Sequence, residues 1–457
     1  MTPDEPTVAL SGWGRASHRQ GLVRRPVSDE DLLRVVRSAS NLTVRGAGRS
    51  YGDAALPESG TVLDMTGHDQ VVSFDENSGV IVVEAGAVLA DLVDQTLPLG
   101  WLLPVLPGTA RITVGGAIAS DVHGKNHPGA ASFGRHVVWL SLLHPDGTTS
   151  ELSPTQDPDA YWATIGGMGL TGVILRAAIQ LQAVETGWAS QRRRRTRSLD
   201  ETIDVLRGLA IQQQADPNHH VVAWLDAHAP GRRLGRGVID ESRPARQTEL
   251  PASLHRLPDR RRVSAGRAVR SLPGPGVVCG ATIAAASAAR WHLAGSHDWG
   301  LLPLTSALCP LDRAEFWPAA FGRRGLIQYQ FAIPPDATEV LLRVLAYLVG
   351  RRMTPALATL KNLGVGTAGP LSFPIPGWTL ALDLPARWVQ DGEGLRRLDV
   401  MVADAGGRVY LAKDSVVDPA LIPTMYPQLK AWRRTKARLD PDRRLTSALA
   451  QRLDLLP

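Results

Sequence analysis

The sequence contains almost no cysteine and no long apolar run. Its 457 residues include two cysteines, Cys279 and Cys309, too few for a disulfide framework, which favours a reduced, cytoplasmic setting. No stretch of about 18 consecutive apolar residues occurs, so a transmembrane helix is not expected. The segment Met1-Thr-Pro-Asp-Glu-Pro6 is acidic and lacks the apolar core of a signal peptide. These absences predict a soluble cytoplasmic protein with at most peripheral membrane contact.

Lysine is scarce as well. Of the 50 lysine and arginine residues only five are lysines, and three of these, Lys125, Lys361 and Lys413, are among the residues singled out below. Arginine serves as well as lysine on most solvated surfaces. A chain that otherwise uses arginine therefore retains lysine where a compact ammonium group matters.

The arginines include the run Arg192-Arg-Arg-Arg195, followed closely by Arg197. Such a run could bind nucleic acid or anionic lipid. We favour the alternative that it forms a solvated strand or a linker between domains, because no aromatic residues are interleaved with it. No nucleic-acid partner is therefore predicted.

What the sequence does contain is an unusual loop, Thr113-Val-Gly-Gly-Ala-Ile-Ala-Ser-Asp-Val-His-Gly-Lys-Asn-His127. Its glycines allow the backbone to approach a large planar or phosphorylated ligand, because no Cβ stands in the way. His123, Lys125 and His127 add proton-transfer and cationic groups at the same place. Since core packing needs none of these polar groups, the composition indicates a ligand-binding loop.

Two further segments have the same character. Arg45-Gly-Ala-Gly-Arg-Ser-Tyr-Gly-Asp53 and Pro107-Gly-Thr109 each follow a short apolar run, and the first offers consecutive backbone N–H groups to an anion. The first segment is not a dinucleotide fingerprint, since Tyr51 occupies the place of the third glycine. A formal G-x-G-x-x-G does occur at 167–172, but residues 173–181 after it alternate like a strand where a helix is needed. We therefore reject a Rossmann fold.

The chain is long enough for two domains. Short apolar runs alternate with turn-rich segments, which indicates an α+β protein. Residues 230–276, rich in Arg, Pro and Ser, are expected to form a long surface excursion. Helices are predicted at 29–38, 88–97, 199–212 and 338–351, and strands at 60–64, 79–86, 220–225, 327–333 and 378–383.

Eight short strings carry a resemblance that spans essentially the whole chain. In order they are similar to strings of the vanillyl-alcohol-oxidase superfamily, and within it to the branch that supplies the oxidase component of decaprenylphosphoryl-ribose 2′-epimerase. Each string alone is weak evidence, whereas eight in the same order are strong evidence. The strings are Gly12-Trp-Gly-Arg15, Gly46-Ala-Gly-Arg-Ser-Tyr-Gly-Asp53, Pro104-Val-Leu-Pro-Gly-Thr109, His123-Gly-Lys-Asn-His127, Gly166-Gly-Met-Gly-Leu-Thr-Gly172, Gln328-Tyr-Gln330, Pro370-Leu-Ser-Phe-Pro-Ile-Pro-Gly-Trp378 and Ala412-Lys-Asp-Ser415.

The resemblance implies a fold and a division into domains. It implies a PCMH-type FAD-binding domain of two subdomains over residues 8–186. A substrate domain built on an antiparallel sheet would follow over 187–407. Residues 408–457 would then return to the FAD domain, which sequence pattern alone does not indicate.

The resemblance also implies FAD as the cofactor. Many members of the superfamily attach FAD through a histidine in the first glycine-rich loop. Arg49 stands at that position and no cysteine lies before Cys279, so FAD is expected to be bound non-covalently. Met168 replaces a family asparagine, which implies the loss of one polar contact with the cofactor. No metal site is predicted. The implied FAD contacts are Gly46, Gly48, Arg49, Ser50, Tyr51, Pro107, Gly108, Thr109, Thr113, Gly116, Ala119, Val122, His123, Gly169, Ile174 and Tyr410.

On the substrate side, the resemblance implies a sugar alcohol held by lysines and glutamines. Oxidation of a secondary alcohol must also remove the hydroxyl proton, and His123 and Lys413 are the candidates for base or relay. Gln328 and Gln330 share one face of a strand because they are two residues apart, so Tyr329 points to the opposite layer. The implied substrate contacts are Lys125, Trp224, Gln328, Gln330, Lys361, Thr379 and Ala381.

Three pocket positions depart from the family pattern. Leu308 replaces a tyrosine, Thr379 an asparagine, and Ala381 the cysteine that covalent inhibitors attack. The first two changes alter hydrogen bonding around the substrate. The thiol of Cys309 is expected to point away from the ligand if residues 308–309 form a strand, and to lie within reach if they form a loop.

The predicted activity is FAD-dependent oxidation of a secondary ring hydroxyl to a ketone, on decaprenylphosphoryl-ribose or a related glycoside. In the family a nicotinamide-dependent reductase partner completes the epimerisation. The alternatives are an oxygen-using sugar or alditol oxidase and a flavin-binding protein without turnover.

Overall fold

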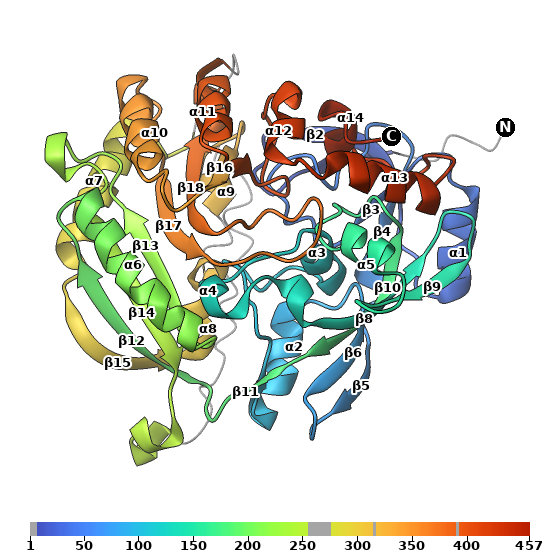
Figure 1. The fold of residues 1–457 in the computed structure, drawn as a ribbon, viewed down its shortest axis with the longest axis horizontal. Coiled ribbons are helices and arrows are strands. Elements are labelled where there is room, and N and C mark those ends of the chain that lie inside the picture. The colour runs from blue at the N-terminus through green and yellow to red at the C-terminus, as the bar shows by residue number, and fades with distance from the viewer. Residues whose placement is uncertain (1–6, 255–275, 314–316, 390–392) are drawn as a thin grey trace.

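The computed structural model describes residues 7–254, 276–313, 317–389 and 393–457. The chain forms an α+β protein with a four-stranded, a five-stranded and a large eight-stranded antiparallel sheet, and a two-stranded ribbon. In Figure 1 the eight-stranded sheet and its helices occupy the left half, and the two smaller sheets occupy the right half.

The four-stranded sheet contains the start of the described chain. The helix between its second and third strands matches the prediction for 29–38. Its N-cap, Ser28, accepts a hydrogen bond from the Asp31 backbone N–H, and Leu32 and Val36 form its buried face. The elements are β1 (Val8–Ser11), β2 (His18–Arg24), β4 (Thr61–Asp64) and β3 (Leu42–Arg45) in sheet order, with α1 (Asp29–Ser38).

The five-stranded sheet contains the segment after the G-x-G-x-x-G string. Residues 173–180 form a strand there, so the rejection of a Rossmann fold is confirmed. The strands are β5 (Val71–Asp75), β6 (Val80–Glu84), β10 (Val173–Gln180), β8 (Val137–Leu143) and β9 (Thr149–Leu152), and the ribbon pairs β7 (Trp101–Leu102) with β11 (Gln182–Ala183). The associated helices are α2 (Leu89–Thr96), α3 (Val114–Ala119), α4 (His127–Ala130) and α5 (Pro158–Thr164).

Every strand pair in the eight-stranded sheet is antiparallel. Helix α6 lies across the front of this sheet in Figure 1 and covers β13, β14 and β17. The strands in sheet order are β15 (His297–Pro303), β12 (Trp188–Arg195), β14 (Gly237–Pro244), β13 (His220–Leu225), β17 (Leu357–Leu363), β18 (Gly377–Pro385), β16 (Leu326–Ile333) and β19 (Arg408–Val409). The helices are α6 (Leu199–Ala215), α7 (Gly280–Leu293), α8 (Leu304–Leu308), α9 (Trp317–Ala320), α10 (Glu339–Gly350) and α11 (Glu393–Asp404).

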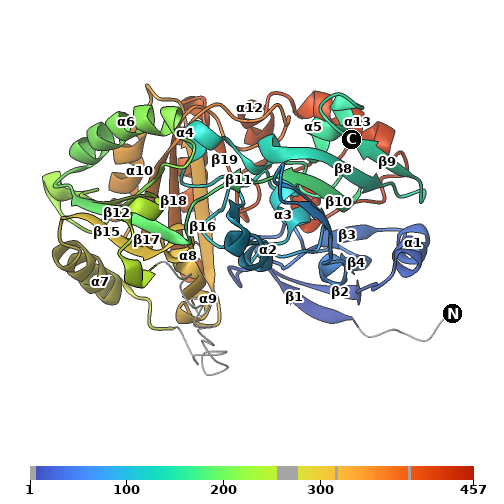
Figure 2. The same ribbon diagram turned by 90° about the horizontal axis from the view of Figure 1, so that it is seen from below.

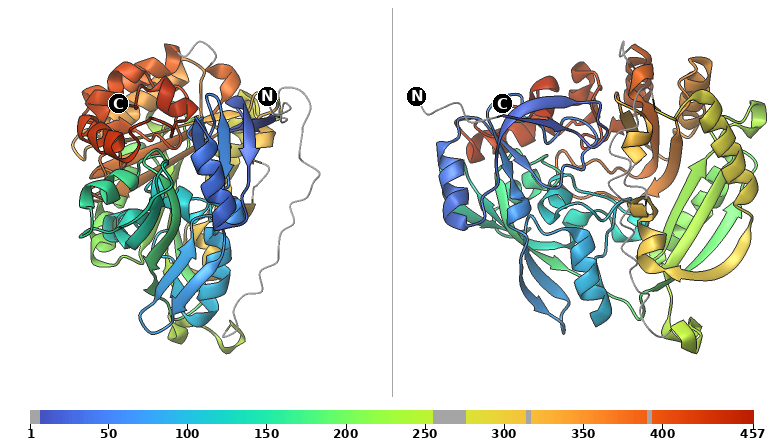
Figure 3. Two further views of the ribbon diagram at one scale, coloured as in Figure 1. Left: turned by 90° about the vertical axis from the view of Figure 1, so that its right-hand side faces the viewer. Right: turned by 180° about the vertical axis from the view of Figure 1, so that it is seen from behind.

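Helix α13 packs against α5, as Figure 2 shows, and in Figure 3 the C-terminal segment, drawn in red, lies close to the N-terminal one, drawn in blue. The Leu42 N–H donates to the Arg444 carbonyl at 2.7 Å, which joins β3 to the segment after α13. Arg452 binds Asp53 and Asp414 at 2.8–2.9 Å and so links two loops far apart in sequence. The helices of the C-terminal segment are α12 (Ile422–Met425), α13 (Leu429–Leu439) and α14 (Ala448–Arg452).

Two sequence-based expectations need correction or refinement. The surface excursion expected at 230–276 is wrong for Gly237–Pro244, which is strand β14 inside the large sheet; residues 255–275 lie outside the described part. The arginine run is part of strand β12 rather than a linker, and Arg192 and Arg193 pair with Glu241 and Asp240 of β14 at 2.7 and 2.6 Å. Cross-strand ion pairs thus explain how so polar a pair of segments forms strands.

No helix among the described residues is both long and apolar enough to cross a membrane.

Candidate active site

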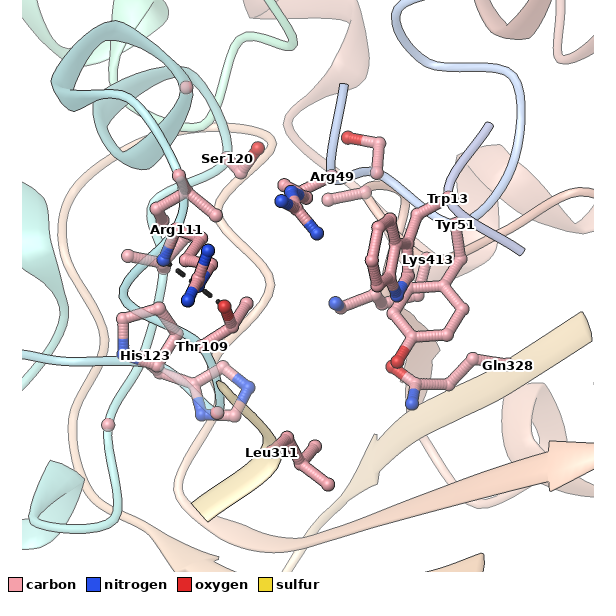
Figure 4. A pocket seen from close by; sticks show the side chains of 18 of the residues that line it. Trp13, Arg49, Tyr51, Thr109, Arg111, Ser120, His123, Leu311, Gln328 and Lys413 are labelled. Atoms are coloured by element: carbon pink, nitrogen blue, oxygen red, sulfur yellow. Dashed lines mark hydrogen bonds between the residues drawn. The ribbon is translucent and has the colours of Figure 1, made fainter. Parts of the chain in front are cut away.

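A cavity of about 580 Å³ lies where the glycine-rich loops face the large sheet. Figure 4 shows Trp13, Arg49, Tyr51, Gln328 and Lys413 on one side, with Thr109, Arg111 and His123 across from them. The cavity therefore brings together residues from the first glycine-rich loop, from strand β16 and from the segment after β19.

The local sequence explains the shape of the first glycine-rich loop. Arg45 at the end of β3 donates to the carbonyls of Ser11 and Ala55, both at 3.0 Å, which anchors the loop at its base. Gly48 has φ +64°, a conformation that disfavours other residues. At Gly46 a Cβ would lie 2.2 Å from Thr113 Oγ1, so only glycine allows this loop to touch the next one.

Two glycines that line the cavity, Gly108 and Gly169, have no close neighbour on the side where a Cβ would stand. A Cβ added at Gly108 or Gly169 would meet its nearest atom only at 3.7 or 3.9 Å, so a side chain there would project into the cavity. The bare backbone at these positions suits a planar or phosphorylated group such as FAD. All sixteen residues to which the sequence assigned FAD contact line this cavity: Gly46, Gly48, Arg49, Ser50, Tyr51, Pro107, Gly108, Thr109, Thr113, Gly116, Ala119, Val122, His123, Gly169, Ile174 and Tyr410.

His123 lies at the junction of the two halves of the cavity. Its side chain is buried, its Nε2 lies 2.9 Å from Gln330 Nε2, and its Nδ1 lies 3.2 Å from Lys361 Nζ. Burial chiefly, with further repulsion from Lys361 and His127, lowers the pKa of His123 well below its usual value. The imidazole is therefore neutral at physiological pH.

Three of the five lysines of the chain face the same cavity. Burial is the main cause of a lowered pKa in each: to about 7 for Lys361 and about 8 for Lys413, with a lowered value for Lys125 too. Lys125 and Lys413 further lower the pKa of Lys361, whereas Asp383 raises that of Lys413. Lys125 donates to the Ala307 carbonyl at 2.7 Å. Lys413 lies 4.3 Å above the ring of Tyr51.

Strand β16 presents its two glutamines to the cavity, as their spacing predicts. Gln328 Nε2 donates to Asp383 Oδ1 at 2.6 Å. Tyr329 points to the opposite layer, where its hydroxyl donates to Asp399 Oδ1 at 2.8 Å. The alternation along the strand thus separates a polar cavity wall from the packing against α11.

The other predicted substrate residues fall into two groups. Trp224 and Ala381 line the cavity, and the Arg290 guanidinium lies 5.1 Å from the centre of the Trp224 ring. Thr379 does not line it but lies behind Gln330, whose Nε2 is 3.2 Å from Thr379 Oγ1. The substrate contact expected of Thr379 stays a prediction, and in the structure the neighbour of its hydroxyl on the cavity side is Gln330.

The placement of residues 308–309 differs from both sequence-based options. Leu308 ends helix α8 and is buried in an apolar cluster, so it does not line the cavity as its family counterpart was expected to. Cys309 is the C-cap of that helix and its Sγ lies 3.5 Å from the Pro107 carbonyl. The segment is therefore neither strand nor loop, and neither residue is among the described residues that line the cavity.

Sequence reasoning missed two buried carboxylates near the site. Asp383 accepts hydrogen bonds from Gln328 and from Trp317 Nε1, the latter at 2.7 Å. Asp121 accepts from the Gly134 N–H at 3.0 Å and from Thr367 at 2.6 Å. Asp383 is the register partner of Gln328. A predicted pairing of the two strands could have revealed Asp383. The contact of Asp121 with Thr367 joins segments too far apart in sequence to be predicted from local pattern.

The described residues also include one group of potential metal ligands outside this cavity, Asp29, His68 and Glu84, whose ligand atoms lie within 4.8 Å of one another. Asp29 already pairs with Arg176 at 3.2 Å, and Glu84 accepts from the Gln70 N–H at 3.0 Å. These contacts account for both carboxylates without an ion.

Comparison with known proteins gives concordant matches. Residues 21–153 match a family described as an FAD binding domain. The chain is 35% identical over 460 residues to decaprenylphosphoryl-beta-D-ribose oxidase of Mycolicibacterium smegmatis, covering 98% of each chain. It is 24% identical over 468 residues to an alditol oxidase of a Streptomyces species, covering 98% of this chain and 99% of that one. With mouse L-gulonolactone oxidase it shares 33% identity over 153 residues, 33% of this chain and 34% of the relative.

Proposed function

Because this chain belongs to the family of decaprenylphosphoryl-β-D-ribose oxidase and is an FAD-dependent oxidoreductase related to the sugar and alditol oxidases, we propose that it oxidises a secondary ring hydroxyl of a sugar to a ketone. The observation that carries the proposal is the convergence of Lys125, Lys361 and Lys413 with Gln328 and Gln330 on one cavity. Ammonium and amide groups suit the hydroxyls of a sugar, and the glycine-rich wall opposite suits a flavin.

The proposed chemistry divides between cofactor and protein. FAD, when bound, supplies the acceptor for the hydride that leaves the alcohol carbon. Lys413 orients the substrate hydroxyl and stabilises negative charge that develops on its oxygen. Gln328 and Gln330 bind neighbouring hydroxyls, and His123 belongs to the group that removes the proton.

We propose that FAD is bound non-covalently. Arg49 occupies the loop position where many relatives carry the attaching histidine, and its guanidinium lies 4.1 Å above the Trp13 ring. Neither cysteine is among the described residues that line the cavity. His123 is the histidine among the described residues that line the cavity. Both nitrogens of its ring already have protein neighbours, which disfavours a covalent bond between this ring and the flavin.

The substrate is proposed to be decaprenylphosphoryl-ribose or a related glycoside. The support is the relative of that printed name, which matches over 98% of its length. The reaction would be the first half of an epimerisation, with a nicotinamide-dependent reductase as partner. We further propose that residues 8–186 and 408–457 form the FAD domain and that 187–407 form the substrate domain, with Lys125 and Lys413 reaching the sugar from the FAD domain.

The test is to follow the flavin absorbance while candidate glycosides and glycosyl phosphates are added without oxygen. Bleaching by a glycoside supports the proposal. Turnover measured with an artificial dye, with and without oxygen, then separates a dehydrogenase from an oxygen-using oxidase. The alditol oxidase relative, which matches over 98% of this chain, makes the oxidase the second candidate. A flavin that no sugar bleaches would favour a binding protein without turnover.

A further inference from the structure

The hydrogen-bond geometry of His123 restricts its role. Both ring nitrogens have close neighbours, Gln330 at Nε2 and Lys361 at Nδ1. A neutral imidazole carries one N–H, so one of its nitrogens donates while the other accepts. Since neither nitrogen is left for a substrate hydroxyl, His123 is a poor direct base.

Only one arrangement tolerates both charge states of Lys361. As an ammonium, Lys361 has donors alone, so His123 Nδ1 must accept and Nε2 must donate. Gln330 then presents its amide oxygen to Nε2, because a half-turn of the amide group exchanges its oxygen and nitrogen. Thr379 Oγ1, 3.2 Å from the same amide atom, donates its hydroxyl proton to that oxygen.

The opposite arrangement fails when the lysine is protonated. If Gln330 donated to His123 Nε2, the N–H at Nδ1 would point at Lys361 Nζ and use its lone pair. An ammonium there would face that N–H without an acceptor. Every hydrogen bond from Lys361 through His123 to Gln330 would then have to change direction. The first arrangement works for the neutral amine too, because one amine N–H donates to Nδ1 and the lone pair remains for the cavity.

We propose that Lys361 is the general base of the oxidation, and that His123, Gln330 and Thr379 are positioning residues that hold its lone pair toward the substrate. The proposal rests on the proposed function. In the step, the substrate O–H bond breaks and the proton goes to the lone pair of Lys361, which becomes an ammonium. The C–H bond breaks and its hydride passes to the oxidised flavin, so the carbon–oxygen double bond forms. The sugar loses two electrons and the flavin gains them.

The electrostatic surroundings support this assignment. The groups facing Lys361 are His123 and Lys125 from the loop after α3, His127 at the start of α4, and Lys413 from the segment after β19. Burial, Lys125 and Lys413 lower the pKa of Lys361 to about 7, which suits a base near neutral pH. Lys413, held closer to its usual value by Asp383, remains the more cationic of the pair.

Two substitutions at Lys361 test whether this residue acts as a base or only supplies positive charge. Lys361→Arg keeps the positive charge and the donors but cannot lose a proton, and Lys361→Gln removes the charge. We expect both to slow substrate-driven flavin reduction by about 10²–10⁴-fold while FAD absorbance persists. Small primary amines should partly rescue Lys361→Gln in proportion to their basicity. Lys430→Gln, at an exposed lysine of α13, is the control and should retain the wild-type rate.

The scarcity of lysine provides a readout that is independent of turnover. With five lysines in the chain, ¹³C-lysine NMR of the FAD-loaded protein can resolve each signal, and Lys361→Gln assigns one of them. Its titration midpoint should lie near 7 rather than near the ordinary value of about 10.4. Thr379→Val should shift that midpoint and slow reduction, whereas Thr379→Ser, which keeps the hydroxyl, should restore both.

Each contrary outcome is distinct. A Lys361→Arg enzyme that reduces flavin at the wild-type rate, or a Lys361 midpoint near 10, overturns the base assignment while the proposed function stands. A wild-type flavin that no sugar reduces overturns the proposed function and the base assignment with it.

Discussion

Lys361 and Lys413 are the same residue type in one cavity, but their neighbours differ. Lys361 faces other cations, whereas Lys413 lies over the Tyr51 ring and senses the Asp383 carboxylate. Such differences divide roles between chemically identical groups, one losing a proton and the other keeping it.

Replacing Lys413 with alanine should nearly abolish flavin reduction by substrate while FAD stays bound. Removal of an electrostatic group of this kind costs about 10²–10³ in rate. Stopped-flow absorbance measures the reduction, and Lys430→Ala, at an exposed position of α13, serves as the control. Near-normal reduction in the Lys413 variant would remove this residue from the catalytic group.

The rate of flavin reduction should show a bell-shaped dependence on pH. It should rise through about pH 7 as Lys361 loses its proton and fall above about pH 8 as Lys413 loses its own. Asp383→Asn removes the carboxylate that raises the pKa of Lys413, so the falling limb should move to lower pH. If the falling limb is unchanged in that variant, the loss of rate at high pH is not caused by deprotonation of Lys413.

Nitroaromatic inhibitors that require thiol capture should leave no adduct on this protein. Ala381 carries no thiol on the cavity wall, and Cys309 is buried against the Pro107 carbonyl at 3.5 Å. Ala381→Cys should create the adduct. Mass spectrometry of the parent protein and of the variant after turnover measures whether an adduct is present on each. Modification of Cys309 in the parent protein would show that this segment lies closer to the ligand than described.

At the scale of elements, local signals predicted some parts of the fold and not others. Helix α1 was predictable because Ser28 caps it and its apolar residues recur on one face. Strand β14 was not predictable, because its acidic side chains are typical of a loop. Only the strand pairing, which places Arg192 and Arg193 of β12 opposite them, explains why they lie in a sheet. The glycine-rich loops of the site were visible as motifs, but the role of Thr379 behind Gln330 depends on strand pairing distant in sequence.

Helix α13 contains a buried ion pair whose loss should destabilise the protein. Lys436 donates to Asp440 with both side chains fully buried, and Asp440 also accepts from the Arg444 and Leu445 N–H groups at 2.9 and 2.8 Å. Lys436→Met would leave the buried Asp440 carboxylate without its cationic partner, which should lower the free energy of unfolding by about 3–5 kcal/mol.

Urea denaturation measures the difference, with Lys430→Met as the matched control on the same helix. Because Lys430 is exposed, its replacement should change the free energy by no more than about 0.5 kcal/mol. Equal destabilisation by the two substitutions would contradict the importance of the buried pair.

At the scale of the whole molecule, the cavity is the meeting place of the glycine-rich loops, the large sheet and the segment after β19. We expect acid or heat to release intact FAD from the yellow protein into the supernatant, because no bond is proposed between them. Absorbance of the supernatant and of the precipitate decides the matter. Flavin that sediments with the polypeptide would show covalent attachment.

The contact of Arg452 with Asp53 spans 399 positions of the sequence, and Arg452 also holds Asp414 beside Lys413. A nascent chain on the ribosome cannot make either contact until residue 452 has emerged. The two loops that carry Asp53 and Asp414 are therefore joined through Arg452 only after the segment that contains it has been made and has folded back onto residues synthesised much earlier.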